Sequence, residues 1–350
     1  MQKALHGGDI AGARRAQPER EWLDFSANIN PLGMPESVKQ AYHAALADCV
    51  HYPDIRNAAL REALAEYEQV LPGQIVCGNG ASELIYRLVQ ELRPKTALYP
   101  VPTFAEYGRA LAAVGTRVST LPLCEESGFA LDNAILPLID RAEMLFLCNP
   151  NNPTGRLIAP ELLEEIAARC AKTGTWLVVD ECFLDFVPDT QARSLKRLLP
   201  QMERLLVLRA FTKTFAMPGL RLGYLIAPSN STARALSGSA VPWSVSVPAQ
   251  YCGIAAAGER AFLERTNRLI AAQRGVLTQG LAACGCRVYR SDSNFILFRH
   301  QDAELAHKLR EKGILIRDAS GFDGLGAGYY RVAVRGPEEN RALLRAMNAV

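Results

Sequence analysis

The sequence predicts an α/β protein built on a sheet of parallel strands, followed by a smaller α+β unit. Up to about residue 245, short apolar runs rich in β-branched residues alternate with longer segments of helical periodicity. This alternation is typical of parallel strands joined by helices. Beyond that point, a long helical segment leads into four short strand-like runs. Glycine, proline and asparagine follow several of the apolar runs, which marks turns at the strand ends.

The elements follow in order along the chain. The first part is expected to hold strands at Gln74–Cys77, Thr96–Tyr99, Arg117–Leu121, Met144–Cys148, Trp176–Asp180, Leu205–Leu208 and Leu222–Ile226. Helices are expected at Ser82–Leu92, Phe104–Val114, Pro160–Lys172 and Arg260–Leu281. Strands are expected in the last part at Arg287–Tyr289, Phe295–Arg299, Ile314–Arg317 and Tyr330–Val334. We therefore expect an N-terminal arm (residues 1–33), a large domain (34–244) and a small C-terminal domain (245–350).

The composition argues against several classes of protein. The chain has 350 residues, a hydrophobic content of 49% and a formal net charge of +3, so nothing indicates a nucleic-acid or acidic-membrane surface. No apolar run approaches the roughly 18 residues of a membrane span, and the start lacks the apolar stretch of a signal peptide. The nine cysteines are scattered and the five histidines dispersed. A reduced, cytoplasmic protein without a metal site is expected.

The stretch VCGNGASELI, from Val76 to Ile85, places glycines between a strand and the start of a helix. The free N–H groups of a helix N-terminus form a ready anion site, so Gly80, Ala81 and Ser82 are candidates for a phosphate cradle. Glu83 stands where a dinucleotide fingerprint has its third glycine. A plain turn with a serine cap remains an alternative.

The stretch FLCNPNNPTG, from Phe146 to Gly155, carries a strand into a loop of asparagine, proline and glycine. Ligands bind at the carboxyl ends of the strands in open α/β sheets, which makes Asn152 a candidate ligand residue. Asn-Pro and Pro-Thr-Gly are also turn formers, so a rigid structural turn remains an alternative.

The stretch WLVVDECFLDF, from Trp176 to Phe186, ends an apolar strand at Asp180 and Glu181. A carboxylate at the end of a buried strand needs a partner. That partner is either a helix cap or a salt bridge within the protein, or a cationic ring nitrogen of a ligand.

The stretch RAFTKTFAMPGLRLGY, from Arg209 to Tyr224, sets a single lysine, Lys213, in a mostly apolar run. Apolar surroundings lower the pKa of a lysine and make its amine a usable nucleophile. A surface lysine in a loop is the alternative for this stretch taken alone.

Together the four stretches match the needs of pyridoxal phosphate. A lysine attaches this cofactor covalently, which fits Lys213. Asp180 can pair with the ring nitrogen and keep the ring an electron sink. Asn152 can donate a hydrogen bond to the ring O3′, and Phe104, in the stretch PTFAEYGRAL, can stack on the ring.

The phosphate of such a cofactor needs several donors. The helix start at Gly80 and Ala81, together with Ser82, Thr212 and Arg221, can provide them. Ala210 stands three residues before Lys213, where a hydroxyl would add a donor; its absence costs about 1 kcal/mol.

These residues resemble the fold-type I pyridoxal-phosphate enzymes, and within them the histidinol-phosphate aminotransferase branch. The resemblance covers essentially the whole chain and rests on the spacing from Asp180 to Lys213 and on the string T-K-x-F-x-x-P-G-L-R-x-G-Y. It implies a large, doubly wound, mostly parallel sheet domain that binds the cofactor, a smaller α+β domain, and an arm packed against the small domain and the site. It also implies a homodimer in which Tyr52 reaches a cofactor phosphate across the interface.

Within that branch, five stretches resemble the L-threonine O-3-phosphate decarboxylase family of cobalamin biosynthesis. They are His6–Ile10, Leu23–Gly33, Phe104–Leu111, Pro242–Val245 and Tyr329–Arg335. Phe183 also stands where aminotransferases of the branch usually carry tyrosine. The resemblance implies decarboxylation of L-threonine O-3-phosphate to (R)-1-amino-2-propanol O-2-phosphate.

The resemblance further implies a substrate pocket rich in anion donors. Its residues would be His6, Gly7, Gly8, Asn28, Asn152, Arg317 and Arg331. Arginine binds phosphate or carboxylate with two parallel hydrogen bonds, and a grip on a remote phosphate can decide which bond at Cα is broken. Which arginine takes which anion stays open, as does a salt-bridge role for both. Lys213 is the expected proton donor to Cα, with Tyr52 or a water as alternatives.

The sequence leaves four other functions to compare with this one. A histidinol-phosphate aminotransferase would share the cofactor but need 2-oxoglutarate as amino acceptor. A decarboxylase of serine phosphate differs by one methyl group, which a pocket discriminates by only about 1–3 kcal/mol. A Rossmann dehydrogenase would need the third glycine of the dinucleotide fingerprint, and this sequence has Glu83 there. A non-catalytic binding protein would be expected to have lost Lys213 or Asp180.

Overall fold

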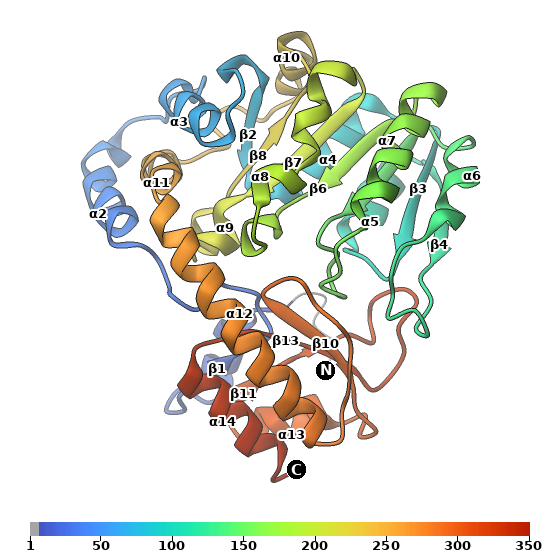
Figure 1. Cartoon of the computed structure of the whole chain (residues 1–350). Coiled ribbons are helices and arrows are strands. Elements are labelled where there is room, and N and C mark those ends of the chain that lie inside the picture. The colour runs from blue at the N-terminus through green and yellow to red at the C-terminus, as the bar shows by residue number, and fades with distance from the viewer. Residues whose placement is uncertain (1–6) are drawn as a thin grey trace.

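A seven-stranded sheet forms the centre of the larger part of the molecule (Figure 1). The computed structural model describes residues 7–350. The strand order is β2-β8-β7-β6-β5-β3-β4; β8 runs antiparallel to both of its neighbours, and the other pairs are parallel. The bounds are β2 (Ile75–Asn79), β3 (Thr96–Val101), β4 (Arg117–Pro122), β5 (Met144–Cys148), β6 (Trp176–Asp180), β7 (Leu205–Ala210) and β8 (Leu222–Ile226).

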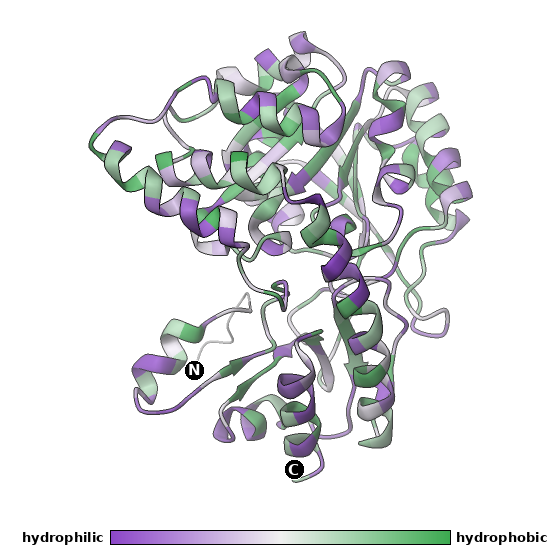
Figure 2. Ribbon diagram, turned by 60° about the vertical axis from the view of Figure 1, so that its left-hand side comes forward, coloured by the Kyte–Doolittle hydropathy of each residue, from purple (hydrophilic) through white to green (hydrophobic). Residues whose placement is uncertain are grey.

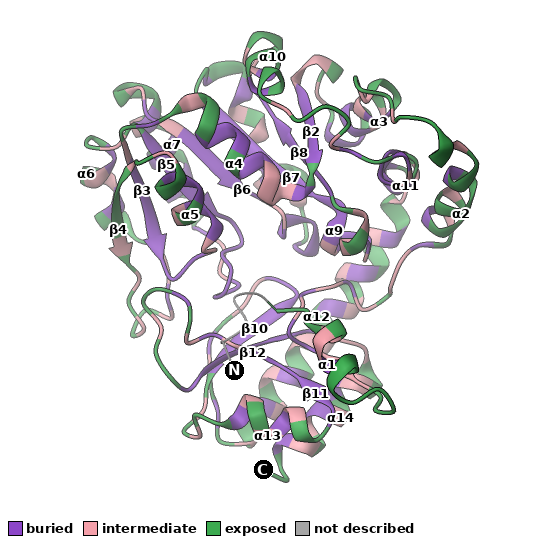
Figure 3. Cartoon of the chain, turned by 180° about the vertical axis from the view of Figure 1, so that it is seen from behind, coloured by how far each residue is buried: buried purple, intermediate pink, exposed green. Residues whose placement is uncertain are grey.

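Both faces of this sheet are covered, which makes the fold doubly wound. Alternate residues of β5 to β7 point to opposite faces, as strand geometry requires. Leu147 and Val179 join a hydrophobic cluster with helices α3, α7 and α11, whereas Phe146 and Val178 join a second cluster with α4, α5 and α10. The central strands are therefore apolar on both sides and buried along their length (Figure 3).

The helices carry hydrophobic residues toward the sheet and hydrophilic residues outward (Figure 2). Their bounds are α1 (Ile10–Ala16), α2 (Glu36–Ala45), α3 (Ala58–Glu68), α4 (Gly80–Leu92), α5 (Glu106–Ala113), α6 (Leu136–Ile139), α7 (Pro160–Thr173), α8 (Thr190–Arg193), α9 (Phe211–Thr214), α10 (Asn230–Gly238), α11 (Val247–Ala257), α12 (Arg260–Ala283), α13 (Leu305–Glu311) and α14 (Pro337–Met347). Within residues 7–350, none of these helices has the length and apolar character needed to cross a membrane.

A smaller, four-stranded antiparallel sheet lies below the large one (Figure 1). Its order is β12-β13-β10-β9, with bounds β9 (Arg287–Val288), β10 (Phe295–Arg299), β12 (Arg317–Asp318) and β13 (Tyr329–Ala333). Helices α12 and α14 pack on it through a third hydrophobic cluster. Strand β1 (Leu23–Asp24) of the arm pairs with β11 (Ile314–Leu315), which attaches the arm to this smaller part.

The predicted fold class is confirmed, and most predicted strands agree with the structure to within two residues at each end. The single strand expected at Ile314–Arg317 is wrong, because the chain divides into β11 and β12 there. Leu23 pairs with Ile314, but Arg317 pairs with Arg331, so two dipeptides separated by one residue belong to different sheets. Such a change of pairing partner depends on distant strands and leaves no local signal. The division into three domains stays a prediction.

Candidate active site

The predicted functional stretches meet at one edge of the large sheet. Strands β3, β5, β6 and β7 are parallel, so their carboxyl ends lie together, and β2 points the same way because β8 is antiparallel to both β2 and β7. The residues that follow these strands are therefore brought close in space. This carboxyl edge is where open α/β sheets bind their ligands.

A cavity of about 430 Å³ opens at this edge, between the large sheet and the smaller one. Of the predicted site residues, it is lined by Gly7, Asn28, Ala81, Ser82, Phe104, Asn152, Asp180, Thr212, Lys213, Arg221, Arg317 and Arg331. Gly8, Gly80 and Tyr52 are not among the lining residues, and His6 lies outside the described residues. The structure thus brings together residues spread over more than 300 positions of the chain.

Lys213 lies in the short helix α9, directly after β7. Its backbone carbonyl accepts a hydrogen bond from the N–H of Asn30, 3.1 Å away, which fixes the lysine backbone against the arm. Burial, together with the charges of Arg331 and Arg221, lowers the pKa of Lys213 to about 8. A substantial fraction of this amine is therefore unprotonated near neutral pH.

Asp180 is held on both carboxylate oxygens. The Tyr107 hydroxyl donates to Oδ2 at 2.7 Å, and the backbone N–H of Cys182 donates to Oδ1 at 3.0 Å. Tyr107 is fully buried and stacks on Phe146, with ring centroids 4.9 Å apart. Burial raises the pKa of this hydroxyl well above its ordinary value, and Asp180 adds to that shift, so it stays a donor. The carboxylate is thereby fixed in orientation.

The start of α4 forms an open cradle. Gly80 has a φ of +79°, and a Cβ at this position would collide with the guanidinium of Arg221. A Cβ at Gly223 would meet the backbone of Gly80 and Ala81. Two glycines therefore let the helix N-terminus, β8 and Arg221 approach closely, as a phosphate cradle requires.

Two buried arginines close the opposite side of the cavity. Arg317 and Arg331 are paired residues of β12 and β13, and both are more than 90% buried. Arg331 donates to Oδ1 of Asn152 and, at 2.9 Å, to the carbonyl of Ser26. Its Nε and the Oδ1 of Asn28 are buried without a hydrogen-bond partner in residues 7–350. Buried polar atoms of this kind indicate that a ligand completes the site.

The lining charges are unbalanced. Four cationic side chains, Lys213, Arg221, Arg317 and Arg331, face the cavity with two carboxylates, Asp180 and Glu106. Glu106 already pairs with Arg109 at 3.4 Å. The surplus of positive charge suits a ligand with more than one anionic group.

Tyr52 lies on the surface, 79% exposed, with its ring stacked on Trp243 at a centroid distance of 4.5 Å. It does not line the cavity of its own chain. A role of Tyr52 at a site therefore needs a second copy of the chain and stays a prediction.

Several lining residues were not predicted from the sequence, among them Ser26, Ala27, Cys148, Cys182 and Phe322. Phe322 stacks under Arg317, whose guanidinium lies 5.5 Å from the ring centroid. Cys148 ends β5 and Cys182 follows Asp180, so position at a strand end is the signal that could have found them. No three histidine, cysteine, aspartate or glutamate residues gather as metal ligands in the described part of the chain.

Comparison with known proteins assigns this site to a family. The model of the family "Aminotransferase class I and II" matches residues 20–347. The chain belongs to that family. This family member is 39% identical to the threonine-phosphate decarboxylase of Salmonella typhimurium, over 99% of this chain and 96% of the relative.

Two solved structures extend the comparison. The histidinol-phosphate aminotransferase from Clostridium acetobutylicum is 30% identical, with a TM-score of 0.87 over 93% of this chain and 98% of the other. The L-threonine-O-3-phosphate decarboxylase from Porphyromonas gingivalis is 25% identical, with a TM-score of 0.81 over the same shares. The resemblance stated from the sequence is confirmed.

The class I and II aminotransferase family uses pyridoxal phosphate, and the cavity of this member fits that cofactor. The cradle at Gly80 and Arg221 matches a phosphate group. Asp180 offers a fixed carboxylate to a ring nitrogen, and Lys213 offers an amine of lowered pKa to an aldehyde. The donor set is therefore complementary to the cofactor at both ends.

Proposed function

We propose that this chain decarboxylates L-threonine O-3-phosphate to (R)-1-amino-2-propanol O-2-phosphate, with pyridoxal phosphate as cofactor, in cobalamin biosynthesis. The observation that carries the proposal is the pair of buried arginines, Arg317 and Arg331, beside a cofactor site that already has its own cation in Arg221. Such a pair suits a substrate with both a phosphate and a carboxylate. The similarity to threonine-phosphate decarboxylases supports the same substrate. We place the reaction in the cytoplasm, in keeping with nine free cysteines.

The cofactor-binding roles follow from position at the sheet edge. Lys213 would attach the cofactor, Asp180 would pair with its ring nitrogen, Asn152 would reach O3′ and Phe104 would cover the ring. The donors to its phosphate would be Gly80, Ala81, Ser82, Thr212 and Arg221. When bound, pyridoxal phosphate supplies a ring that accepts the electron pair released from a broken bond at the substrate Cα.

The anion donors of the small sheet and the arm orient the substrate. Arg317 and Arg331, with Asn28 and the backbone of Gly7 and Gly8, would hold its phosphate and carboxylate. Binding energy spent on the phosphate, away from the reacting bond, would orient the substrate so that the bond from Cα to the carboxylate is the one that breaks. An aminotransferase would instead have to orient its substrate for loss of the proton at Cα.

Lys213 is the proposed proton donor that completes the reaction. Lys213 lines the cavity, so its amine, when not bound to the cofactor, would lie close to the substrate. Its lowered pKa allows it to take up and release a proton near neutral pH. It would deliver this proton to Cα after CO₂ has left.

The active protein is proposed to be a homodimer. Val50 and Ile55 flank Tyr52 in the chain, Trp243 stacks on it, and all four are large hydrophobic residues more than 45% exposed. A second copy would cover this surface and receive Tyr52 at its cofactor phosphate. Sedimentation in solution should give twice the chain mass, and Tyr52→Phe should weaken cofactor binding without dissociating the dimer. A monomer with full activity would contradict the proposal.

The test of function is CO₂ release from L-threonine O-3-phosphate with no keto acid added. Repeated turnover to aminopropanol phosphate is expected of the cofactor-loaded protein. L-serine O-3-phosphate should be a weaker substrate, because the two differ by one methyl group. No CO₂ release, together with reaction of histidinol phosphate once 2-oxoglutarate is supplied, would make the chain an aminotransferase.

A further inference from the structure

A charged network is buried behind the cofactor-binding edge, on the side of β7 that faces away from the cavity. It consists of Arg209 in β7, Glu68 in α3, Glu181 and Asp185 after β6, and Lys196. The first four side chains are at most 6% exposed. Burial on this scale is costly for charged groups unless each is paired, and here each is.

Arg209, the centre of this Arg209 network, ties three segments of the chain together. Its Nε donates to Oε1 of Glu68 at 3.0 Å, and its Nη2 donates to Oδ1 of Asp185 at 2.5 Å. Its Nη1 donates to the backbone carbonyl of Glu181 at 3.3 Å. The planar guanidinium therefore fixes α3 and the turn after β6 relative to β7.

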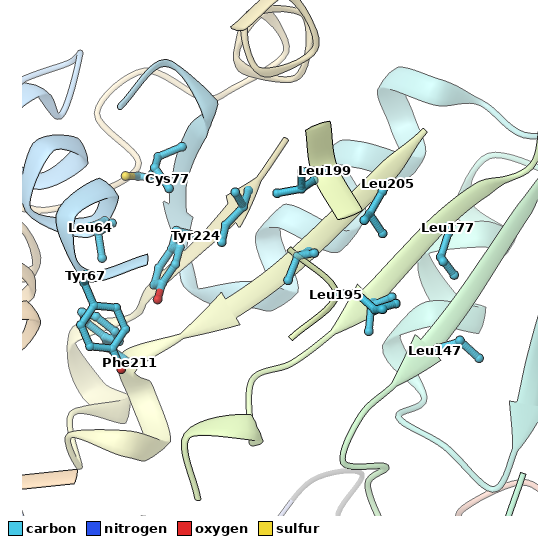
Figure 4. Packing of buried hydrophobic residues seen from close by; sticks show 14 of the residues in the cluster. Leu64, Tyr67, Cys77, Leu147, Leu177, Leu195, Leu199, Leu205, Phe211 and Tyr224 are labelled. Atoms are coloured by element: carbon cyan, nitrogen blue, oxygen red, sulfur yellow. The ribbon is translucent and has the colours of Figure 1, made fainter. Parts of the chain in front are cut away.

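The carboxylates of Glu68 and Glu181, which both pair with Arg209, also accept hydrogen bonds from other residues. The Nζ of Lys196 and the hydroxyl of Tyr224 each donate to Glu68 at 2.6 Å. The hydroxyl of Ser194 donates a hydrogen bond to Oε2 of Glu181, also at 2.6 Å. The buried rings of Tyr67 and Tyr224 both pack edge-on against Phe211, with centroid distances of 5.3 and 5.4 Å (Figure 4).

The network is linked to both ends of the cofactor site. Glu181 follows Asp180 directly, and because neighbouring strand residues point to opposite faces, the network holds one side of the strand end while Asp180 faces the cavity. Asp185 accepts a hydrogen bond from the hydroxyl of Thr214, 3.3 Å away. Thr214 follows Lys213, and its carbonyl is held from the other side by Asn30 at 2.7 Å.

We propose that the Arg209 network is a positioning device that fixes Lys213 relative to Asp180, and so sets the affinity for the cofactor and the proton equilibrium of the lysine-bound cofactor. This inference rests on the proposed cofactor chemistry but not on the identity of the substrate. The two residues must act on opposite ends of one planar group, so a small relative displacement weakens both contacts. No member of the network touches the cavity itself.

The Arg209 network holds more carboxyl groups than cations. Three carboxyl groups face two cations, Arg209 and Lys196. Burial would raise the pKa of Glu68, but these two cations hold it below its ordinary value. Burial raises the pKa of Glu181 to about 7, although Arg209 opposes this, while Glu68 adds to it. Between about pH 4.5 and 7 the folded chain binds a proton at Glu181 that the unfolded chain has lost, so the contribution of Glu181 to stability falls as pH rises through this range.

The experiment replaces Arg209 by lysine, which keeps the charge but loses the planar fork. The cofactor dissociation constant of Arg209→Lys is expected to rise by about tenfold or more. The midpoint of the pH titration of its visible absorption band is expected to move by at least about half a pH unit. Thr214→Val is the milder second variant, because it breaks only the contact with Asp185, and its midpoint should move too.

The matched control is Arg335→Lys, in a pair with Glu339 at 2.6 Å in the smaller part of the molecule. The cofactor dissociation constant of this control should stay within about twofold of wild type, and its titration midpoint within about 0.2 pH units. If the two network variants lower the melting temperature but leave both cofactor readouts unchanged, the network is merely structural and the inference is overturned. A wild-type protein that binds no cofactor would instead refute the proposed function, and this inference with it.

Discussion

Lys213→Ala is expected to lose at least about four orders of magnitude in the rate of CO₂ release from L-threonine O-3-phosphate. The substitution removes both the covalent attachment of the cofactor and the proposed proton donor to Cα, and general acid catalysis alone contributes about 10²- to 10⁴-fold. The measurement is single-turnover decarboxylation at saturating pyridoxal phosphate. Added small amines should restore part of the rate, because they can supply the missing proton.

Attachment of the cofactor to the wild-type protein provides a second readout on the same residue. With a pKa of about 8, roughly a quarter of Lys213 is unprotonated at pH 7.5, against about 0.1% for a lysine with the ordinary value of 10.5. The attachment rate of the cofactor-free protein should therefore rise with pH and level off above about 8. Lys172→Ala, at an exposed position of α7, is the control and should match wild type. Near-normal turnover by Lys213→Ala would contradict the assigned role.

The large sheet and the cofactor residues could be predicted from the sequence because their signals are local. Strands β5 and β6 are continuous apolar runs with turn residues after them, and their predicted bounds match the structure. Asp180 ends such a strand, and Asn152 and Lys213 lie within four residues of the ends of two others, so the carboxyl edge of a parallel sheet had to bring them together.

The remaining features depend on contacts between distant residues. Tyr107 reaches Asp180 across 73 positions, and Glu68 reaches Arg209 across 141 positions. No local pattern marks either pair: Tyr107 reads as an ordinary aromatic residue of a helix and Glu68 as a surface acid. The same holds for Ser26, whose carbonyl accepts from Arg331 over 305 positions. Sequence patterns therefore identified the groups that meet the ligands better than those that position them.

Arg331→Met is expected to lower kcat/KM for L-threonine O-3-phosphate by roughly 30- to 4,000-fold, from a loss of about 2–5 kcal/mol. The guanidinium is 5% exposed, and its named acceptors, Asn152 and Ser26, are uncharged oxygens. Burial lowers the pKa of Arg331 to about 9, and the charge of Arg317 acts in the same direction. Such a cation gains its full stabilisation only when a substrate anion enters. Steady-state kinetics with the loaded variant measure the effect.

The stability of the same variant should change far less than is expected when a structural arginine is replaced. Removing a buried charge that lies beside Arg317 relieves repulsion and desolvation, which offsets the two lost hydrogen bonds. We therefore expect a melting temperature within a few degrees of wild type for Arg331→Met. Arg209→Met should instead be strongly destabilised, because it removes the guanidinium that pairs with both Glu68 and Asp185 in a buried site. If kcat/KM of Arg331→Met were unchanged, or if this variant were destabilised as much as Arg209→Met, Arg331 would have a structural role. Arg317 alone would then be the arginine that binds the substrate.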